Sequence, residues 1–342
     1  MKKWLSLLLV TLLLLSSALA DTAFFYTTDS VTDCANTNAM YDNFYAAGEL
    51  SVSIPGCAQD LVPQGIDYWE EQDWMLICGY SSGSRNSAIV AVDMKTNQVV
   101  KEVFLLNVDG SGYNGHAGGM CVTEKNIFIS NNQQLFRISL ENFRALPASS
   151  ECAFDEAIPV PSRASYCAYA NGILWVGEFA YGSEYKTDKS HRAKSADGTQ
   201  RAWICGYQLD QSTENELKAD CVTAEGVIPD YILSTTERIQ GMTFHNNQFY
   251  LSQSYGRNAS SVIYRYNNVL ENAAALEADV YGKTVPLWFL DSTVRTGMLF
   301  APPMSETLCE ANGSVYVLFE SGAEKYRNAK NPMDRVFKLT GY

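Results

Sequence analysis

A repeated pattern of three short strands constrains the fold of this 342-residue chain more than any other feature. In the stretches 64–93 and 240–266, a Gly stands in the first strand pattern and an Arg-Asn pair precedes the third. Weaker copies of the pattern occupy residues 116–139, 165–207 and 305–339. Self-similarity at this spacing is typical of proteins built from repeated units around or along an axis.

The spacing of the copies predicts a propeller. Five copies over the 322 residues after position 20 give about 64 residues each, which suits four-stranded blades. Residues 99–106, 226–233 and 284–291 are candidates for the fourth strand, whereas the second copy shows no clear one. The last copy stops at the chain end, so residues 49–54 are expected to complete it and close the ring.

The sequence therefore predicts an all-β, five-bladed β-propeller of antiparallel four-stranded blades, closed by an N-terminal strand. Six blades are the alternative, if the stretch 179–239 contains a further copy. Two separate sandwiches would be the third arrangement, but the match between the first and fourth copies favours the propeller.

The first twenty residues have the pattern of a signal peptide. Lys2 and Lys3 precede an apolar run, and Ala18-Leu19-Ala20 forms a small-residue cleavage site. We expect a signal peptide over 1–20, an N-terminal segment over 21–45 and the propeller over 46–342. The apolar run is too short to span a membrane, and no later stretch is apolar enough, so a secreted, extracellular protein is expected.

The charge balance bears on partners. The chain has 25 Lys and Arg against 38 Asp and Glu, a net charge of −13, and no basic block. This argues against nucleic acid as a partner and is compatible with a monomer that binds a small molecule, peptide or glycan.

Nine cysteines follow the expected cleavage site, and an exported protein can form disulfides. Cys205 and Cys221 flank a short polar stretch, and Cys34 and Cys57 could fasten the N-terminal segment, so both pairs are expected. The odd number leaves at least one thiol free. The absence of a CxxC motif and the scatter of three His argue against zinc.

Polar residues recur where each inner strand begins and each second strand ends. In a propeller these positions lie on one face, at the mouth of the central channel. A packed core alone would not require such polar groups, although they could also satisfy one another and trapped water. The first set is Gln64, His116, Tyr166, Gln240 and Glu306, and the second is Cys78, Asn131, Glu178, Gln253 and Glu320.

Three carboxylates, Glu178, Glu306 and Glu320, are expected to share this channel mouth. Crowding of like charges raises at least one pKa and suits general acid–base catalysis. Glu306 and Glu320, with His116 as a partner, are the predicted catalytic residues. A central Ca²⁺ would be another way to neutralise the carboxylates, but no cofactor is required by the sequence.

Arg-Asn pairs in three second loops add positive charge to the same face, at Arg85, Arg257 and Arg327. The insertion 181–200 adds further Lys, His and Arg residues. Such groups suit a ligand carboxylate or phosphate. Pairing of the arginines with the glutamates would explain them equally well.

The run Gln240-Gly-Met, followed by Ser252-Gln-Ser-Tyr-Gly-Arg-Asn-Ala-Ser-Ser, resembles the repeat of plant-type glutaminyl cyclotransferases. Gln64-Gly65 and Glu320-Ser321-Gly322 are similar to parts of the same pattern, which also resembles that of uncharacterised exported bacterial propellers. The resemblance covers short motifs in two or three blades. Cys78 stands where the family has a Glu, and the second blade reads Gly-His-Ala-Gly-Gly over 115–119.

This resemblance implies a secreted five-bladed propeller and cyclisation of an N-terminal glutamine with loss of ammonia, with Glu320 or Glu306 as acid–base group and His116 as partner. Two other functions are compatible with the residues. One is a non-catalytic module that binds a glycan or peptide. The other is a glycoside hydrolase, which needs two suitably spaced carboxylates. The sequence alone does not decide whether the protein is an enzyme.

Overall fold

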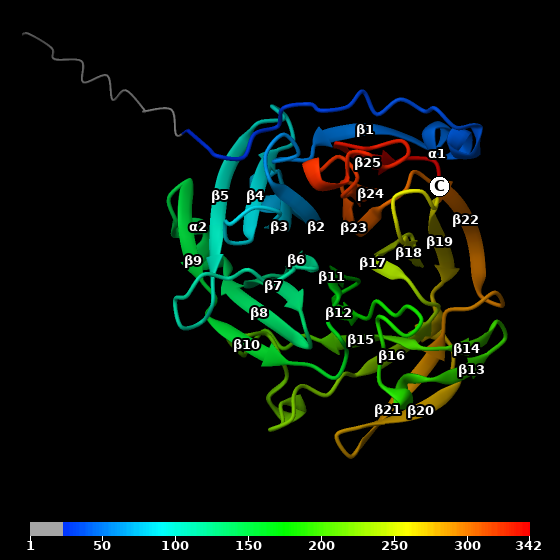
Figure 1. Ribbon diagram of the computed structural model, residues 1–342. Helices are drawn as coiled ribbons and strands as arrows, with labels where there is room; N and C mark the ends of the chain where they lie inside the picture. Colours follow the sequence, from blue (N-terminus) through cyan, green and yellow to red (C-terminus); the bar gives the residue numbers. More distant parts are fainter. Residues whose placement is uncertain (1–22) are drawn as a thin grey trace, which may run out of the picture.

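The computed structural model describes residues 23–342 and forms a five-bladed β-propeller. Figure 1 shows the sheets arranged around a central axis, with the strands β2, β6, β11, β17 and β23 meeting in the middle. The predicted fold class is confirmed, including the number of blades. The predicted signal peptide, residues 1–20, lies outside the described residues.

The first two blades are antiparallel sheets in which each strand pairs with the next outward. A further strand, β9 (Ser149–Ala153), adds to the outside of blade one in parallel orientation. From the axis outward, blade one contains β2 (Leu61–Trp69), β3 (Trp74–Ser81), β4 (Ala88–Asp93) and β5 (Val99–Leu106), and blade two contains β6 (Gly119–Val122), β7 (Asn126–Asn131), β8 (Gln134–Ser139) and β10 (Glu156–Pro159).

The third and fourth blades repeat this order. Blade three is extended by a hairpin from a later part of the chain. The hairpin consists of β20 (Leu276–Val280) and β21 (Lys283–Phe289), and β21 runs parallel to β16 (Tyr231–Thr235). From the axis outward, blade three contains β11 (Tyr166–Ala170), β12 (Ile173–Gly177), β15 (Ala202–Gln208) and β16 (Tyr231–Thr235), and blade four contains β17 (Ile239–His245), β18 (Gln248–Gln253), β19 (Ser261–Asn267) and β22 (Arg295–Ala301).

These pairings correct the predicted fourth strands. Residues 284–291 were expected to complete blade four, but β21 pairs with β16 of blade three, and β22 is the outer strand of blade four. Residues 226–233 overlap β16 only in part. In the second blade, where no fourth strand was evident, the short β10 fills the place. Outer strands carry the weakest sequence pattern because one side is exposed.

The fifth blade closes the ring through the N-terminal part of the chain, as predicted. Its strands are β23 (Ser305–Ala311), β24 (Ser314–Phe319), β25 (Arg335–Leu339) and β1 (Gly48–Ser53). Leu50 lies opposite Phe337 in the antiparallel pairing of β1 with β25. Because the outermost strand comes from the other end of the chain, the first and last residues of the propeller hold each other in place.

Short helical elements connect the strands. The α-helices are α1 (Asp42–Ala46) and α2 (Leu140–Ala145), and the 3₁₀ turns are η1 (Ala39–Tyr41), η2 (Glu70–Gln72), η3 (Lys189–His191), η4 (Ala219–Cys221), η5 (Val269–Glu271) and η6 (Glu324–Tyr326). Among residues 23–342, no helix has the length and apolar character needed to cross a membrane.

The hydrophobic core consists of separate layers between neighbouring blades. Ile89 of blade one packs with Ile129 of blade two in one layer, and Trp175 of blade three with Leu251 of blade four in another. Small residues bring the inner strands together at the axis. A Cβ on Gly65 would lie 2.6 Å from the Met120 nitrogen, so this approach requires glycine.

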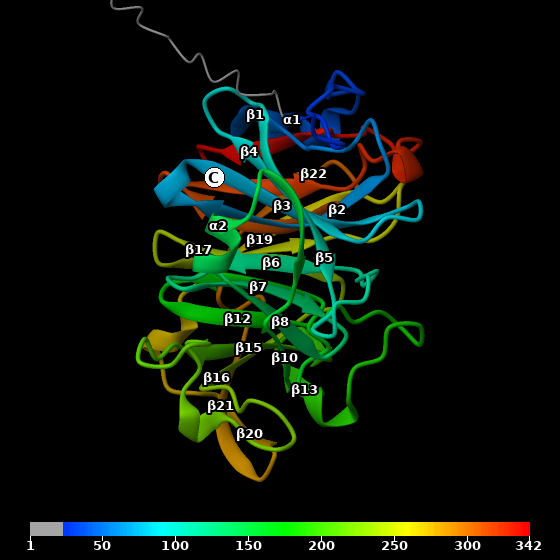
Figure 2. The same ribbon diagram turned by 90° about the vertical axis from the view of Figure 1, so that its left-hand side faces the viewer.

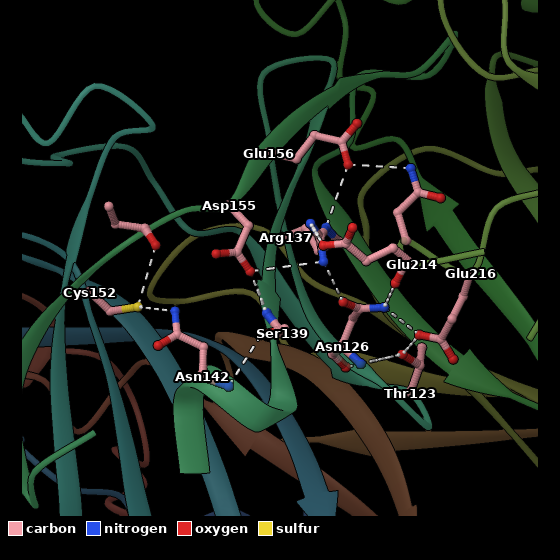
Figure 3. A network of polar contacts seen from close by, with 12 residues as sticks. Thr123, Asn126, Arg137, Ser139, Asn142, Cys152, Asp155, Glu156, Glu214 and Glu216 are labelled. Carbon is pink, nitrogen blue, oxygen red and sulfur yellow. Dashed lines mark hydrogen bonds and ion pairs between the residues drawn. The ribbon is translucent and has the colours of Figure 1, made fainter. Parts of the chain in front are cut away.

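A buried arginine fastens the loop after β15 to the outside of blade two (Figure 3). Arg137 on β8 donates to Asn126 Oδ1 at 3.0 Å and to Glu214 Oε1 at 3.0 Å. Asn126 in turn donates to Glu216 Oε2 at 2.7 Å. Both terminal nitrogens of Arg137 have acceptors from the chain itself, and Nε lies 3.5 Å from Glu156 Oε2, so the network stabilises the loop.

The cysteines are unpaired in the structure. All nine are free thiols, so the expected pairs Cys205–Cys221 and Cys34–Cys57 are not present. Cys205 is buried within β15, whereas Cys221 lies at the edge of the same core layer and is only partly buried. The Cys34 sulfur donates instead to Asp334 Oδ1 at 3.0 Å.

Candidate functional site

A pocket of about 550 Å³ lies at one end of the central channel. Its floor is formed by the first residues of the inner strands, and its walls by the loops that follow the second strands. This volume is within the range of small-molecule sites in proteins. The predicted site residues that line it are Gln64, His116, Asn131, Gln240, Arg257, Glu306 and Glu320.

Irregular strand pairing directs three of these side chains into the pocket. The pairing of β2 with β3 shifts between Pro63 and Gly65, and that of β17 with β18 shifts between Ile239 and Gly241. A third shift lies between Ser305 and Leu308 in β23. Gln64, Gln240 and Glu306 are the residues left over at these bulges. A bulge turns a side chain away from the regular alternation, here toward the axis.

Glu306 and Glu320 lie together on the pocket floor, close enough for each to affect the pKa of the other. Glu306 is buried and Glu320 is partly buried. Gln64 Nε2 donates to Glu320 Oε2 at 3.0 Å, and Gln240 Nε2 donates to Glu306 Oε1 at 3.3 Å. The two bulged glutamines therefore orient the two carboxyl groups.

Burial raises the pKa of both glutamates, and the charge of Glu320 raises that of Glu306 further. Desolvation, and then the charge of Glu320, raise the pKa of Glu306 well above its usual range. Desolvation raises the pKa of Glu320 to about 7, against the lowering effects of Gln64, of the Glu306 carboxyl and of the nearby Lys325 and Arg257. Two carboxyls in contact cannot readily both be charged, so the pair holds a proton near neutral pH.

The inner strands close together directly beneath this pair. Thr307 Oγ1 accepts a hydrogen bond from the Ile66 nitrogen and donates one to the Gln64 oxygen, both at 3.0 Å. A Cβ on Gly241 would lie only 2.4 Å from the Thr307 Cα. The pocket is therefore open on one face of the ring and closed below the carboxyl pair.

Aromatic side chains form two opposite walls. On one side the His116 ring is accessible from the pocket and stacks on Tyr80, with 4.7 Å between ring centroids. Tyr80 shares a hydrogen bond of 3.2 Å with Tyr326, and Lys325 donates to Tyr80 at 2.8 Å. Desolvation and the Lys325 charge lower the pKa of His116, so this imidazole is neutral at pH 7.

The other wall contains Phe179, Tyr185 and Tyr255. The Phe179 and Tyr185 rings are 5.1 Å apart and meet edge to face, and the Tyr255 ring lies against that of Tyr181 at 4.3 Å. Tyr181 and Tyr185 belong to the insertion that also contains β13 (Ala193–Ser195) and β14 (Gly198–Gln200). Figure 2 shows this insertion projecting from one face of the propeller.

Several predicted site residues lie away from the pocket. Tyr166 lies on β11, which pairs with β12 without a bulge, and its side chain is fully buried over Gly177. Gln253 donates to the Glu237 oxygen at 2.8 Å, and Arg85 pairs with Asp60 at 3.2 Å. Arg327 donates to the backbone oxygens of Cys57 and Gly322. Cys78 is buried between blades one and two.

Glu178 was expected to join the other two carboxylates but holds the insertion instead. Its Oε2 accepts from the Trp203 nitrogen at 3.0 Å and contacts His191 Nδ1 at 2.9 Å, and its Oε1 accepts from the Arg163 nitrogen at 3.0 Å. The His191 ring stacks on Trp203, with 3.7 Å between centroids. This buried carboxylate therefore fixes η3 of the insertion beside the pocket.

We expect Glu178→Gln to loosen the insertion, because an amide in this position turns a donor toward groups that need an acceptor. The free energy of unfolding should fall by about 2 kcal/mol, and limited proteolysis should cut within residues 181–200 faster. Glu184→Gln, in the same insertion but exposed, is the matched control. Unchanged cleavage in Glu178→Gln would contradict this role.

The sequence reasoning missed Arg163, the aromatic walls and Tyr326. Near the end of the second strand an aromatic residue recurs in three blades: Tyr80 is the penultimate residue of β3, and Phe179 and Tyr255 lie two residues after β12 and β18. This recurrence was a signal that could have indicated the walls. Arg163 gave no such signal, because its place in the pocket depends on the course of the loop before β11.

The sequence left a central Ca²⁺ open as a way to neutralise the glutamates. Residues 23–342 contain no group of three or more His, Cys, Asp or Glu placed to hold a metal ion. The two glutamates at the axis contact each other and two amide donors, and an amide nitrogen is not a ligand for a cation.

Comparison with known proteins shows no match to any protein family and no similar curated protein. Several solved structures resemble the chain at low identity. Structural alignment with the GH43_1 enzyme from Xanthomonas citri, complexed with xylose, gives 11% identity over 89% of this chain and 93% of that chain, with a TM-score of 0.45. BamB from Moraxella catarrhalis gives 8% identity over 86% and 94% of the two chains, with a TM-score of 0.36.

A putative oxidoreductase (glucose dehydrogenase) from Thermus thermophilus gives 11% identity over 85% of this chain and 99% of that chain, with a TM-score of 0.41. No function follows from similarities at this level. The protein is thus defined by its own topology and site. It is a five-bladed propeller with an acidic pair at the bottom of a one-sided, aromatic-walled pocket.

Proposed function

We propose that the pocket binds the amino-terminal end of a secreted peptide and that Glu306 and Glu320 catalyse cyclisation of an N-terminal glutamine. The observation that carries this proposal is the carboxyl pair, which is positioned by Gln64 and Gln240 on the floor of the pocket. A pocket closed beneath its reactive groups favours the end of a chain over its middle. The resemblance of the Gln240-Gly241 and Glu320-Ser321-Gly322 motifs to glutaminyl cyclotransferases supports the same reaction.

The reaction needs one proton acceptor and one proton donor. The α-amino nitrogen of the substrate attacks the side-chain amide carbon, and a C–N bond forms to close the five-membered ring. The charged carboxylate of the pair takes a proton from the attacking nitrogen. The protonated carboxyl gives a proton to the departing nitrogen as the original C–N bond breaks, and ammonia leaves. The pair ends with one proton, as it began, so atoms and charge balance.

The other pocket groups have roles in holding the substrate. The neutral His116 can exchange hydrogen bonds with a polar group, and the aromatic walls can pack against the side chain that follows the glutamine. The pocket can also speed the reaction by holding the α-amino group against the side-chain amide, since both groups belong to the same glutamine.

The glycoside hydrolase alternative needs two carboxyls on opposite sides of a sugar, about 5–5.5 Å apart in a retaining enzyme and about 6.5–9.5 Å apart in an inverting one. Glu306 and Glu320 instead lie side by side, each affects the pKa of the other, and each is oriented by its own glutamine, so we favour a single acid–base pair. Non-catalytic binding of a peptide or glycan is the alternative that the assay below distinguishes.

The test is incubation of the purified protein with short peptides that begin with glutamine. We expect release of ammonia and a matching mass loss from the peptide. The same peptides with an acetylated amino terminus are the control, because a blocked amine cannot attack. Binding of the free peptides without any ammonia release would contradict the catalytic proposal and favour a binding module.

A further inference from the structure

A second pocket of about 310 Å³ adjoins the main one. The two share Asn132 and Arg163, so a bound chain can pass from one to the other over the Arg163 side chain. The second pocket lies between the loop that follows β7 and the part of the insertion around Lys186 and His191. It contains none of the aromatic residues that line the main pocket.

The walls of the second pocket are held in place by buried contacts. Glu178 accepts hydrogen bonds from the Arg163 backbone on one side and contacts His191 on the other. Arg163 Nη1 also donates to the Lys186 oxygen at 2.8 Å. These contacts join the two sides of the pocket, so its shape is a built feature of the fold.

The charged groups that face the second pocket favour an anionic ligand group. The cations are Arg163, of which one N–H is used by the Lys186 oxygen, and Lys186, which is exposed at the rim. The carboxylates are Glu178 and Asp188. Glu178 is occupied by its three partners, and Asp188 accepts from the Ser190 nitrogen and hydroxyl through Oδ1. Asp188 Oδ2 is then the one remaining carboxylate oxygen against the other N–H groups of Arg163 and the ammonium of Lys186. The unsatisfied groups are therefore mainly donors.

We infer that the second pocket is a subsite for an acidic side chain of the bound peptide, a short distance after its first residue. This inference rests on the proposed function, because the direction of the chain is set by the amino terminus at Glu306 and Glu320. The guanidinium of Arg163 and the ammonium of Lys186 would both contact the carboxylate, as charge-assisted hydrogen bonds. Peptides with an acidic residue near the amino terminus are then the preferred substrates.

The test uses glutamine-initiated pentapeptides that carry a single Glu at position two, three or four, each compared with the peptide that has Gln there. We expect kcat/KM to be about fivefold higher for the acidic peptide at one of these positions. Lys186→Gln should lower this ratio, because only Arg163 then faces the carboxylate, and Lys186→Glu should lower it further. Lys194→Gln, in the same insertion but outside both pockets, should leave the ratio unchanged.

The outcomes separate this inference from the proposed function. Turnover without any preference for the acidic peptides overturns the subsite and leaves cyclisation standing. If ammonia is not released, binding of the same peptides is measured by calorimetry. A preference in Kd that Lys186→Gln lowers then supports the subsite, although the catalytic proposal fails. A ratio unaffected by either Lys186 substitution overturns the subsite.

Discussion

Replacing Glu320 with glutamine is expected to lower kcat/KM for cyclisation by about a thousandfold, and replacing Glu306 is expected to do the same. Each substitution leaves the pocket with one carboxyl, which can hold a proton or accept one but cannot do both in a single step. Glutamine retains the shape and most hydrogen bonds of the side chain. Gln248→Glu, far from the pocket on β18, is a control for a change of charge elsewhere.

The dependence of the cyclisation rate on pH is a second test of the Glu306–Glu320 pair. Below the first ionisation both carboxyls carry protons, and no base is available. Since burial raises the pKa of Glu320 to about 7, activity should rise with an apparent pKa near that value. Activity should fall again at higher pH, where the pair loses its second proton and no acid remains. A flat profile between pH about 5 and 9 would contradict the shared-proton mechanism.

The carboxyl pair should make the free energy of unfolding fall as the pH rises, whereas a carboxylate in an ordinary salt bridge makes it rise. In the unfolded chain a glutamate loses its proton near pH 4.5, the ordinary value, whereas the folded pair keeps a proton to about pH 7 or above. The unfolded state therefore binds fewer protons over this interval, so stability is present below about pH 4.5 and is lost as the pH rises.

Glu306→Gln and Glu320→Gln should remove this loss, so both variants should match or exceed the melting temperature of the original protein at pH 8. Thermal unfolding at pH 4 and pH 8 measures the effect. A destabilisation of more than about 3 kcal/mol in both variants would identify the glutamates as structural partners of a charged group and would end the catalytic proposal.

The architecture could be predicted because the repeat is carried by buried inner strands. The second strands have nearly continuous apolar runs, such as Met75-Leu-Ile-Cys in β3 or Phe249-Tyr-Leu in β18. The pairing of β1 with β25 could be predicted because the last copy of the repeat reaches the end of the chain before a fourth strand. The outer strands were less predictable, and the hairpin of β20 and β21 joins a blade that its sequence position did not indicate.

The candidate site could be predicted only in part, because a residue of the first set enters the pocket from an inner strand only where that strand has a bulge. A bulge changes which way a side chain points, and a regular strand pattern does not reveal it. Gln64, Gln240 and Glu306 therefore turn into the pocket, whereas the aligned Tyr166 packs into the core. In blade two the aligned position is Gly119, and His116 reaches the pocket from the preceding loop.

The closure of the ring leads to the largest stability effect that we expect. Deleting residues 23–53 removes β1 and exposes the edge of β25, where Leu50 pairs with Phe337. The blade would lose its outer strand and part of its core layer, including Val52 and Phe44. We expect no cooperative unfolding transition and self-association through the open edge, measured by urea unfolding and sedimentation.

A single side chain tests the same closure without truncation. Asp334, just before β25, is buried, and its Oδ2 accepts from the Val31 nitrogen at 2.5 Å and the Thr32 nitrogen at 2.9 Å. Asp334→Ala leaves these donors and the Cys34 thiol without an acceptor, so the free energy of unfolding should fall by about 3 kcal/mol. Asp279→Ala, on the outer hairpin of blade three, is the matched control and should cost much less. If Asp334→Ala were as stable as this control, the N-terminal segment would not fasten the ring, and closure would depend on the pairing of β1 alone.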